Sequence, residues 1–241
     1  MRRTRTAQGG RNGKRAAARW PVAAAAAAAA GALAIAGCGQ TQFGAAALYS
    51  NQRISTVKLT AEVANLNAAY QADKTKLNPQ YTQAQMPQQV LSWMLRFATT
   101  DQLAKRLGIH VTPAYAQRQA NAEKAKLAQS GDTLKQAAVL NGLPPNLLPD
   151  LGRWLAIQLK LQQVLSHGVP PTTNAAQQIL LAKINHVQCL TAKSMHIKVN
   201  PQYGAYDYHQ FAVVSLPSKL SAVPGAHPKA SSPAPQLRPN C

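Results

Sequence analysis

The densest apolar segment of the chain, residues 90–107, most limits how the chain can fold. Its apolar side chains cover nearly the whole circumference of a helix with 3.6 residues per turn: Val90, Leu91, Trp93, Met94, Leu95 and Phe97. A helix that is apolar all round is buried on several sides. We therefore expect this helix at the centre of the fold, with Trp93 and Met94 in the core rather than lining a groove.

Helical patterns surround this segment on both sides. Leu59, Val63 and Leu66 recur at helical spacing in a helix capped by Ser55 and ending near Lys76. Four more helices are predicted over residues 113–129, 133–141, 146–167 and from 174 onward, with Thr112, Asp132 and 172–174 as their caps. The helix at 113–129 is polar, so we expect it at the surface. In the long helix, an apolar stripe is predicted (Leu147, Leu151, Trp154, Leu155, Leu161, Leu165), with Arg153, Lys160 and Gln162 facing away.

Two short segments have strand character. Residues 46–49 precede a turn at 50–53, and residues 195–199 alternate apolar and polar side chains, as a half-buried strand does. Residues 203–207 read as an aromatic turn. We expect the strand near Leu48 to pair with the one near Ile197. The sequence thus predicts a mostly α fold of about six helices, with a small two-stranded β pairing that joins the N- and C-terminal segments.

The N-terminus carries an export pattern. Residues 1–19 hold seven Lys/Arg and no acid, and an uncharged run over 22–35 follows. The residues 33–38 (LAIAGC) resemble a bacterial lipobox, in which the cysteine is acylated and becomes the first residue of the mature protein. We expect a signal peptide at 1–37, a palmitate-type lipid on Cys38, and a location on the extracytoplasmic face of the cell membrane. An uncleaved anchor and a plain secretory signal remain alternatives, and Sec and twin-arginine export are not distinguished.

The predicted mature chain is one basic domain with flanking segments. Without residues 1–37 it has 204 residues, with 19 Lys/Arg against seven acids, a net charge of +12. We predict a tether at 38–45, a helical domain at 46–208 and a Pro-rich disordered tail at 209–241. Outside the membrane such a charge would meet anionic headgroups and acidic wall polymers, and we expect no nucleic-acid partner. Solubility alone is an equally good reason for the charge.

Three cysteines occur in the chain. If Cys38 carries lipid, Cys189 and Cys241 remain as candidates for a disulfide in an oxidising compartment. A free C-terminal cysteine or a bond between molecules is the alternative.

The sequence offers little catalytic chemistry. No two histidines have the i, i+4 spacing of a helical zinc site flanking a glutamate, and no Gly-rich phosphate loop or Gly-x-Ser-x-Gly motif occurs. His186, Cys189 and His196 make a metal site conceivable, but a surface histidine beside a disulfide explains them better. We therefore predict no metal, no cofactor, no catalytic residues and no enzymatic activity.

The order of helix-starting motifs is more informative. The predicted helical domain begins with a strand, continues through Ile54-Ser55 and enters an amphipathic helix. This order resembles the start of the N-terminal domain of SurA-like and PrsA-like chaperones. The run 107–113 (LGIHVTP) is similar to that family's Gly-Ile-x-Val-Thr segment, and 169–173 (VPPTT) begins a helix like the family's short one. The segment 199–207 (VNPQYGAYD) resembles the end of members without an isomerase domain, so the resemblance covers about 46–208.

This resemblance implies a function. It implies a SurA-N-like lobe acting as a lipid-anchored, ATP-independent chaperone or holdase for unfolded or extended exported polypeptides. A parvulin prolyl-isomerase domain needs about 90 residues or more, and no such stretch is left between the matching segments. The alternative from another class is a non-catalytic envelope scaffold or adaptor that binds one specific partner. Neither the client nor the client-binding residues nor the oligomeric state can be named from the sequence.

Overall fold

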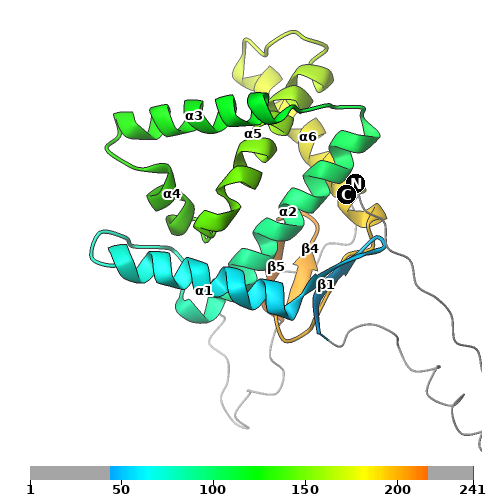
Figure 1. Cartoon of the computed structure of the whole chain (residues 1–241). Coiled ribbons are helices and arrows are strands. Elements are labelled where there is room, and N and C mark those ends of the chain that lie inside the picture. The colour runs from blue at the N-terminus through cyan, green and yellow to red at the C-terminus, as the bar shows by residue number, and fades with distance from the viewer. Residues whose placement is uncertain (1–43, 217–240) are drawn as a thin grey trace, which may run out of the picture. The chain divides into compact units, whose positions relative to one another are not determined.

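The computed structural model describes residues 44–216 and Cys241, and this part is mostly α-helical as predicted (Figure 1). It contains six α-helices, two 3-10 helices and two small antiparallel sheets. In chain order the elements are β1 (Ala45–Tyr49), β2 (Gln52–Ser55), α1 (Thr56–Asp73), η1 (Gln83–Gln85), α2 (Met86–Arg106), α3 (Pro113–Gln129), α4 (Leu134–Leu140), η2 (Pro145–Leu147), α5 (Leu148–Leu165), α6 (Asn174–Ser194), β3 (Lys198–Val199), β4 (Ala205–Asp207) and β5 (Ala212–Val214).

Helix α2 lies at the centre of the fold, as its apolar circumference predicts. It packs against α1, α5, α6 and β5, and Val90, Leu91 and Leu95 are fully buried. Met94 is buried as expected, whereas Trp93 is only half-buried and packs edge-on against Trp154. The prediction of a core position is therefore confirmed for Met94 and needs correction for Trp93.

The predicted β pairing between the two ends of the domain is present. Leu48 of β1 is paired with Lys198 of β3, and Ala47 is paired with Val199, both antiparallel. The sheet has three strands rather than two, because β2 folds back on β1 and gives the order β2-β1-β3. The predicted turn at 50–53 is thus shorter, and Gln52 and Arg53 belong to a strand. Strand β3 is also shorter than the predicted 195–199.

A second hairpin was not predicted. Tyr206 of β4 is paired with Val213 of β5, in the region read as an aromatic turn. The backbone N–H of Val213 donates to Oγ of Ser92 on α2 over 2.8 Å, which fixes the hairpin on the central helix. The folded domain therefore extends past the predicted boundary at residue 208, and residues 212–214 are not part of a disordered tail. Residues 217–240 of that tail lie outside the described part.

The helix starts follow local side-chain chemistry. The hydroxyls of Ser55, Thr112 and Thr173 each accept a hydrogen bond from a backbone N–H in the first turn, so these three predicted caps are confirmed. The prediction of Asp132 as a cap is wrong. Thr133 is the N-cap of α4 and forms a capping box with Gln136, while the Asp132 carboxylate accepts from the Ser130 hydroxyl.

The buried face of α5 differs from the stripe predicted for the long helix. In α5 the buried residues are Gly152, Ala156, Ile157 and Leu161, and the long helix begins only at Leu148 after a 3-10 turn. Arg153, predicted to face away, is half-buried and bonded to Asp101. In α6, Cys189 is buried and Leu190 is 47% exposed. Helix α1 ends at Asp73, three residues before the predicted Lys76.

Two apolar clusters stabilise the domain. The larger surrounds α2 and includes α1, α4 and the strands, whereas a smaller one joins α2, α5 and α6 through Leu103, Leu161, Leu180 and Ile184. None of the helices between residues 44 and 216 combines the length and the apolar character needed to cross a bilayer. In Figure 1, α1 and α3 lie on opposite sides of the domain, and α4 lies between their ends.

Candidate functional site

Helix α3 forms one side of a hollow in the described surface. Its sequence is rich in Gln, Lys and Ala, and none of its side chains is buried. It packs mainly on α5, with a weaker contact to α4. Helix α3 contributes little to the core. The space between α3 and α5 is therefore not completely filled by side chains, and a groove remains there.

The crossing of α3 and α5 is close because the facing residues are small. A Cβ atom at Gly152 of α5 would lie 3.0 Å from the carbonyl oxygen of Ala116 and 3.0 Å from Cβ of Ala120. Only the absence of a side chain at Gly152 lets the two helices meet at this distance. The groove begins immediately beside this contact.

This α3–α5 groove has a volume of about 550 Å³. Its lining combines small or apolar side chains with amides and two cations: Pro113, Ala116, Ala120, Leu134, Leu148 and Pro149, with Gln117, Asn121, Lys124 and Arg153. No lining residue is acidic. The volume lies within the range of about 300–1,000 Å³ typical of ligand pockets, and the apolar lining with a few polar groups is also typical of them.

The two cations of the groove differ in their surroundings. Nε of Arg153 donates to Oδ1 of Asp101 over 2.8 Å, which is the one salt bridge in the described part. Lys124 is exposed and has no such partner among residues 44–216 and 241. Lys124 is therefore the cation at this groove that is available to an acidic ligand.

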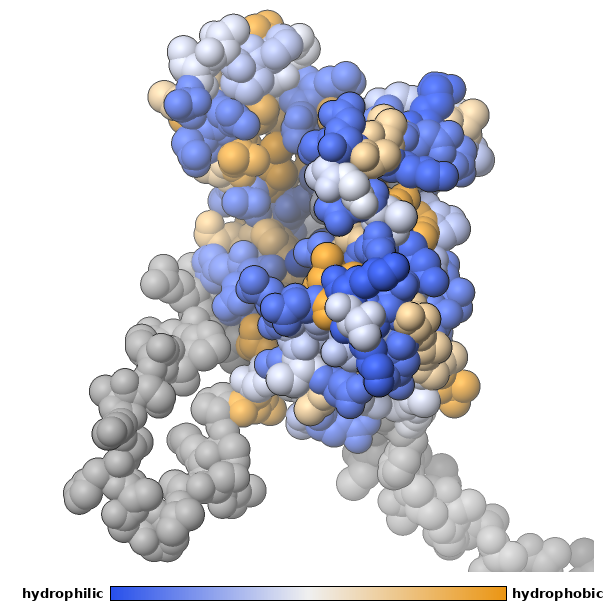
Figure 2. Space-filling view, turned by 90° about the vertical axis from the view of Figure 1, so that its left-hand side faces the viewer, coloured by the Kyte–Doolittle hydropathy of each residue, from blue (hydrophilic) through white to orange (hydrophobic). Residues whose placement is uncertain are grey.

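A second hollow of about 220 Å³ shares Leu134 with the groove. It is framed by Trp93 of α2, Leu127 of α3 and Trp154 of α5. Nε1 of Trp93 donates to the carbonyl of Asn141 over 2.8 Å, which fixes the indole at this position. Figure 2 turns the side on which α4 lies towards the viewer, and hydrophobic residues are visible there in recesses between hydrophilic projections.

Carboxyl groups gather where α1, α2 and α5 meet. Burial raises the pKa of Glu62, and Asp150 adds to this effect while Lys58 opposes it. Burial likewise raises the pKa of Asp150, opposed by Lys58 and Arg153 and increased by Asp101. Oε2 of Glu62 is buried without a hydrogen-bond partner in the described residues. The sequence did not reveal this clustering, because the three acids are 39 and 49 positions apart.

The residues singled out from the sequence lie elsewhere. Cys38 lies outside the described residues. Cys189 and Cys241 form a disulfide, with Cα atoms 5.7 Å apart, that links the C-terminal residue to α6. Nδ1 of His186 lies 3.2 Å from the carbonyl oxygen of Cys241. Among residues 44–216 and 241, no group of three or more His, Cys, Asp or Glu side chains is placed to hold a metal ion.

No family model, curated protein or solved structure matches this chain.

Proposed function

We propose that this protein is a lipid-anchored, ATP-independent chaperone that holds extended exported polypeptides in its α3–α5 groove. The observation that supports this proposal most is the composition of the groove: an apolar floor of small residues, amide groups beside it and an exposed cation. A surface of this kind accepts apolar side chains without requiring one particular shape.

Each part of the groove has a role in this proposal. Leu134, Leu148 and Pro149 contact apolar client side chains, while Gln117 and Asn121 offer amides that pair with the client's main chain. Lys124 attracts acidic clients and raises their rate of encounter. The apolar floor is short, so binding is weak enough for client release without ATP.

The anchor places the groove near the membrane. Residues 44–216 hold 16 Lys/Arg and seven acids, a net charge of +9. A basic domain tethered by lipid at Cys38 is held close to anionic headgroups, where exported chains first emerge. The anchor and the groove thus act together on newly exported polypeptides.

An aggregation assay tests this proposal. The purified full-length protein is mixed at near-stoichiometric ratio with two unrelated unfolded clients, and light scattering is followed. We expect protection of both clients. Protection of neither, together with capture of one folded partner at low salt, would instead identify an adaptor.

A matched pair of variants locates the activity. Asn121→Trp fills the groove from an exposed position on α3, whereas Asn67→Trp introduces the same side chain at an exposed position of α1. We expect Asn121→Trp to weaken protection severalfold and Asn67→Trp to leave it unchanged. Equal protection by both variants would exclude the groove as the client site.

A further inference from the structure

A crevice separate from the α3–α5 groove lies between α2, α5 and α6. It has a volume of about 230 Å³, and one end is closed by Phe211, just before β5. Arg96, Thr99 and Thr100 come from α2, and Trp154 and Gln158 come from α5. Four amide side chains line it, Gln158, Gln162, Asn185 and Gln188, and no lining residue is acidic.

The cation of this crevice has no anionic partner in the described part of the chain. Arg96 stacks on Trp93, with Cζ 4.5 Å from the ring centroid, and the salt bridge found in this part involves Arg153 instead. Burial lowers the pKa of Arg96, with Tyr206 opposing this effect. A partly desolvated guanidinium without a counter-ion is unfavourable, and an anion that enters the crevice relieves that cost.

A hydrogen-bond donor that lines this crevice is also left unsatisfied. Nε1 of Trp154 is buried and has no hydrogen-bond partner among the described residues. An indole N–H can only donate, so its missing partner must be an acceptor. Natural proteins leave few buried polar groups unpaired, and such groups often mark a ligand position.

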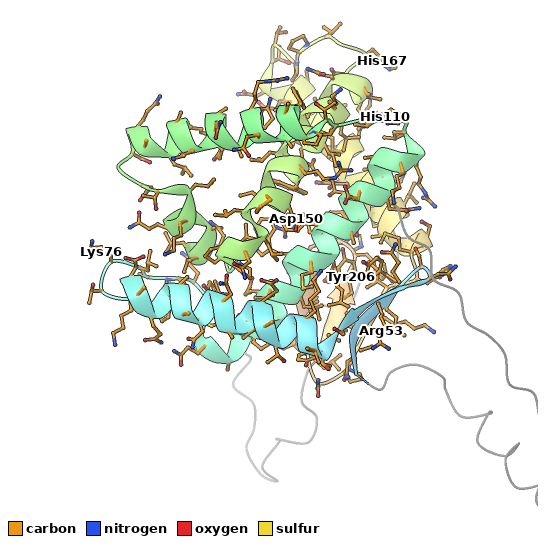
Figure 3. All side chains as sticks on the ribbon, viewed as in Figure 1. Arg53, Lys76, His110, Asp150, His167 and Tyr206 are labelled. Atoms are coloured by element: carbon orange, nitrogen blue, oxygen red, sulfur yellow. A yellow bond between two sulfur atoms is a disulfide. The ribbon has the colours of Figure 1, made fainter. Side chains whose placement is uncertain are left out.

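The Thr99 hydroxyl has a close neighbour in the hydroxyl of Tyr206, and both residues are buried, with Thr99 3% and Tyr206 5% exposed. Burial raises the pKa of Tyr206 to about 12, although the neighbouring Thr99 hydroxyl and Arg96 oppose this effect. The phenol therefore stays protonated and can donate. Figure 3 labels Tyr206 of β4 beside α2.

Apolar side chains also line the crevice. Leu181, Ile184 and Phe211 are among its lining residues, and Leu181 is 42% exposed although it is a large apolar residue. A ligand that fits this lining combines an acceptor-rich anionic group with a hydrocarbon group.

We propose that this crevice binds a carboxylate attached to an apolar side chain, with Arg96 and the Trp154 N–H holding the carboxylate. A guanidinium can bind a carboxylate through two parallel hydrogen bonds. Leu181, Ile184 and Phe211 contact the hydrocarbon part. The small volume limits the ligand to about one residue, so it is either a free carboxylic acid or the C-terminal residue of a polypeptide. This inference does not depend on the chaperone proposal.

Calorimetric titration of the full-length protein tests the site with matched probes. N-acetyl-leucine carries the proposed carboxylate, and N-acetyl-leucinamide has the same shape without the charge. We expect the acid to bind at least about tenfold more tightly than the amide, because a hydrogen bond to a charged group is worth more than a neutral one. A third probe, a peptide ending in leucine with a free C-terminus, identifies the source: tighter binding than N-acetyl-leucine indicates a polypeptide end, and equal binding indicates a free acid.

Two variants separate the roles of the residues. Arg96→Gln removes the charge and Trp154→Phe removes the N–H. We expect Arg96→Gln to weaken acid binding about tenfold and Trp154→Phe about fivefold, with little effect on the amide. Arg53→Gln, at an exposed position in β2, is the matched control and should leave binding unchanged.

The outcomes are decisive in both directions. Selective acid binding that is lost in Arg96→Gln and Trp154→Phe supports the site. No binding of the acid, equal binding of acid and amide, or unchanged acid binding in the variants overturns it. If the thermal transition of Arg96→Gln shows that it does not fold, Trp154→Phe decides the result.

Discussion

Gly152 of α5 and Ala120 of α3 face each other so closely that a Cβ atom at residue 152 would lie 3.0 Å from Cβ of Ala120. This contact fixes the helix that forms one side of the α3–α5 groove. Helix α3 has no buried side chain, and it is held mainly by its packing on α5. The geometry of the groove therefore depends strongly on this pair.

Substitution at Gly152 is expected to release α3. Gly152→Val adds a branched side chain where Ala116 and Ala120 leave no room, and overpacking of this kind costs about 1–3 kcal/mol. We predict a lower thermal transition and faster hydrogen exchange in residues 113–129. The control is Ala182→Val, which introduces valine at an exposed position of α6. Unchanged exchange in α3 would show that other contacts position it.

The Ser92 hydroxyl is expected to hold the C-terminal hairpin on α2. Ser92 is buried, accepts from the N–H of Val213 over 2.8 Å and donates to the carbonyl of Gln88 over 2.6 Å. Ser92→Ala leaves the Val213 N–H without a partner, which costs about 1–3 kcal/mol. We predict this loss in chemical unfolding. Ser130→Ala, at an exposed hydroxyl, should change stability much less, and equal effects of both variants would contradict the assigned role.

The disulfide is expected to contribute substantially to stability. It joins residues 52 positions apart, and the chain-entropy model assigns about 4 kcal/mol to closing a loop of this length. We predict that Cys241→Ser lowers the free energy of unfolding by up to this amount. Reductant should lower the stability of the wild type to that of the variant and leave the variant unchanged. A wild type that is insensitive to reductant would show that the bond does not stabilise the fold.

Glu62 is expected to make stability depend on pH. Burial raises its pKa in the folded state, so the folded protein binds this proton more tightly than the unfolded chain does. The contribution of Glu62 to the stability of the fold is therefore favourable below the ordinary pKa of a glutamate. It is lost as the pH rises through the raised pKa of the folded state. We predict that Glu62→Gln is more stable than the wild type at neutral pH. Above pH 5, the free energy of unfolding of the variant should fall less steeply with rising pH than that of the wild type.

Thermal unfolding across pH 4 to 8 checks this prediction. The matched control is Glu123→Gln on α3, which lies away from the Glu62 and Asp150 pair. A pH profile of Glu62→Gln that coincides with the wild type would contradict the role of Glu62.

The sequence predicted those features that depend on neighbouring residues. The caps at Thr112 and Thr173 need only a hydroxyl two or three positions before a backbone N–H, and the central position of α2 follows from its own apolar circumference. The pairing of the strand near Leu48 with the strand near Ile197 was predicted because both segments have strand character, and the structure shows it as β1 with β3. Local chemistry and periodicity determine these features.

Features that depend on distant partners could not be predicted in the same way. Val213 forms a strand because Tyr206 pairs with it and because Ser92, 121 positions earlier, accepts its N–H. The α3–α5 groove is likewise invisible in the sequence, since Ala116 and Ala120 have the pattern of an ordinary surface helix until Gly152 is placed against them. The carboxyl cluster and the Arg96 crevice each combine residues from three elements.

Photo-crosslinking from inside the groove tests the central claim most directly. A photoreactive amino acid is placed at Asn121, which lines the groove, and separately at Lys76, an exposed residue that Figure 3 shows at the far end of α1. Each full-length protein is irradiated with an unfolded client under conditions that prevent aggregation. We predict abundant crosslinks to the client from residue 121 and few from residue 76. Equal yields from both positions, or none from residue 121 while aggregation is still suppressed, would contradict the proposal that clients bind in the α3–α5 groove.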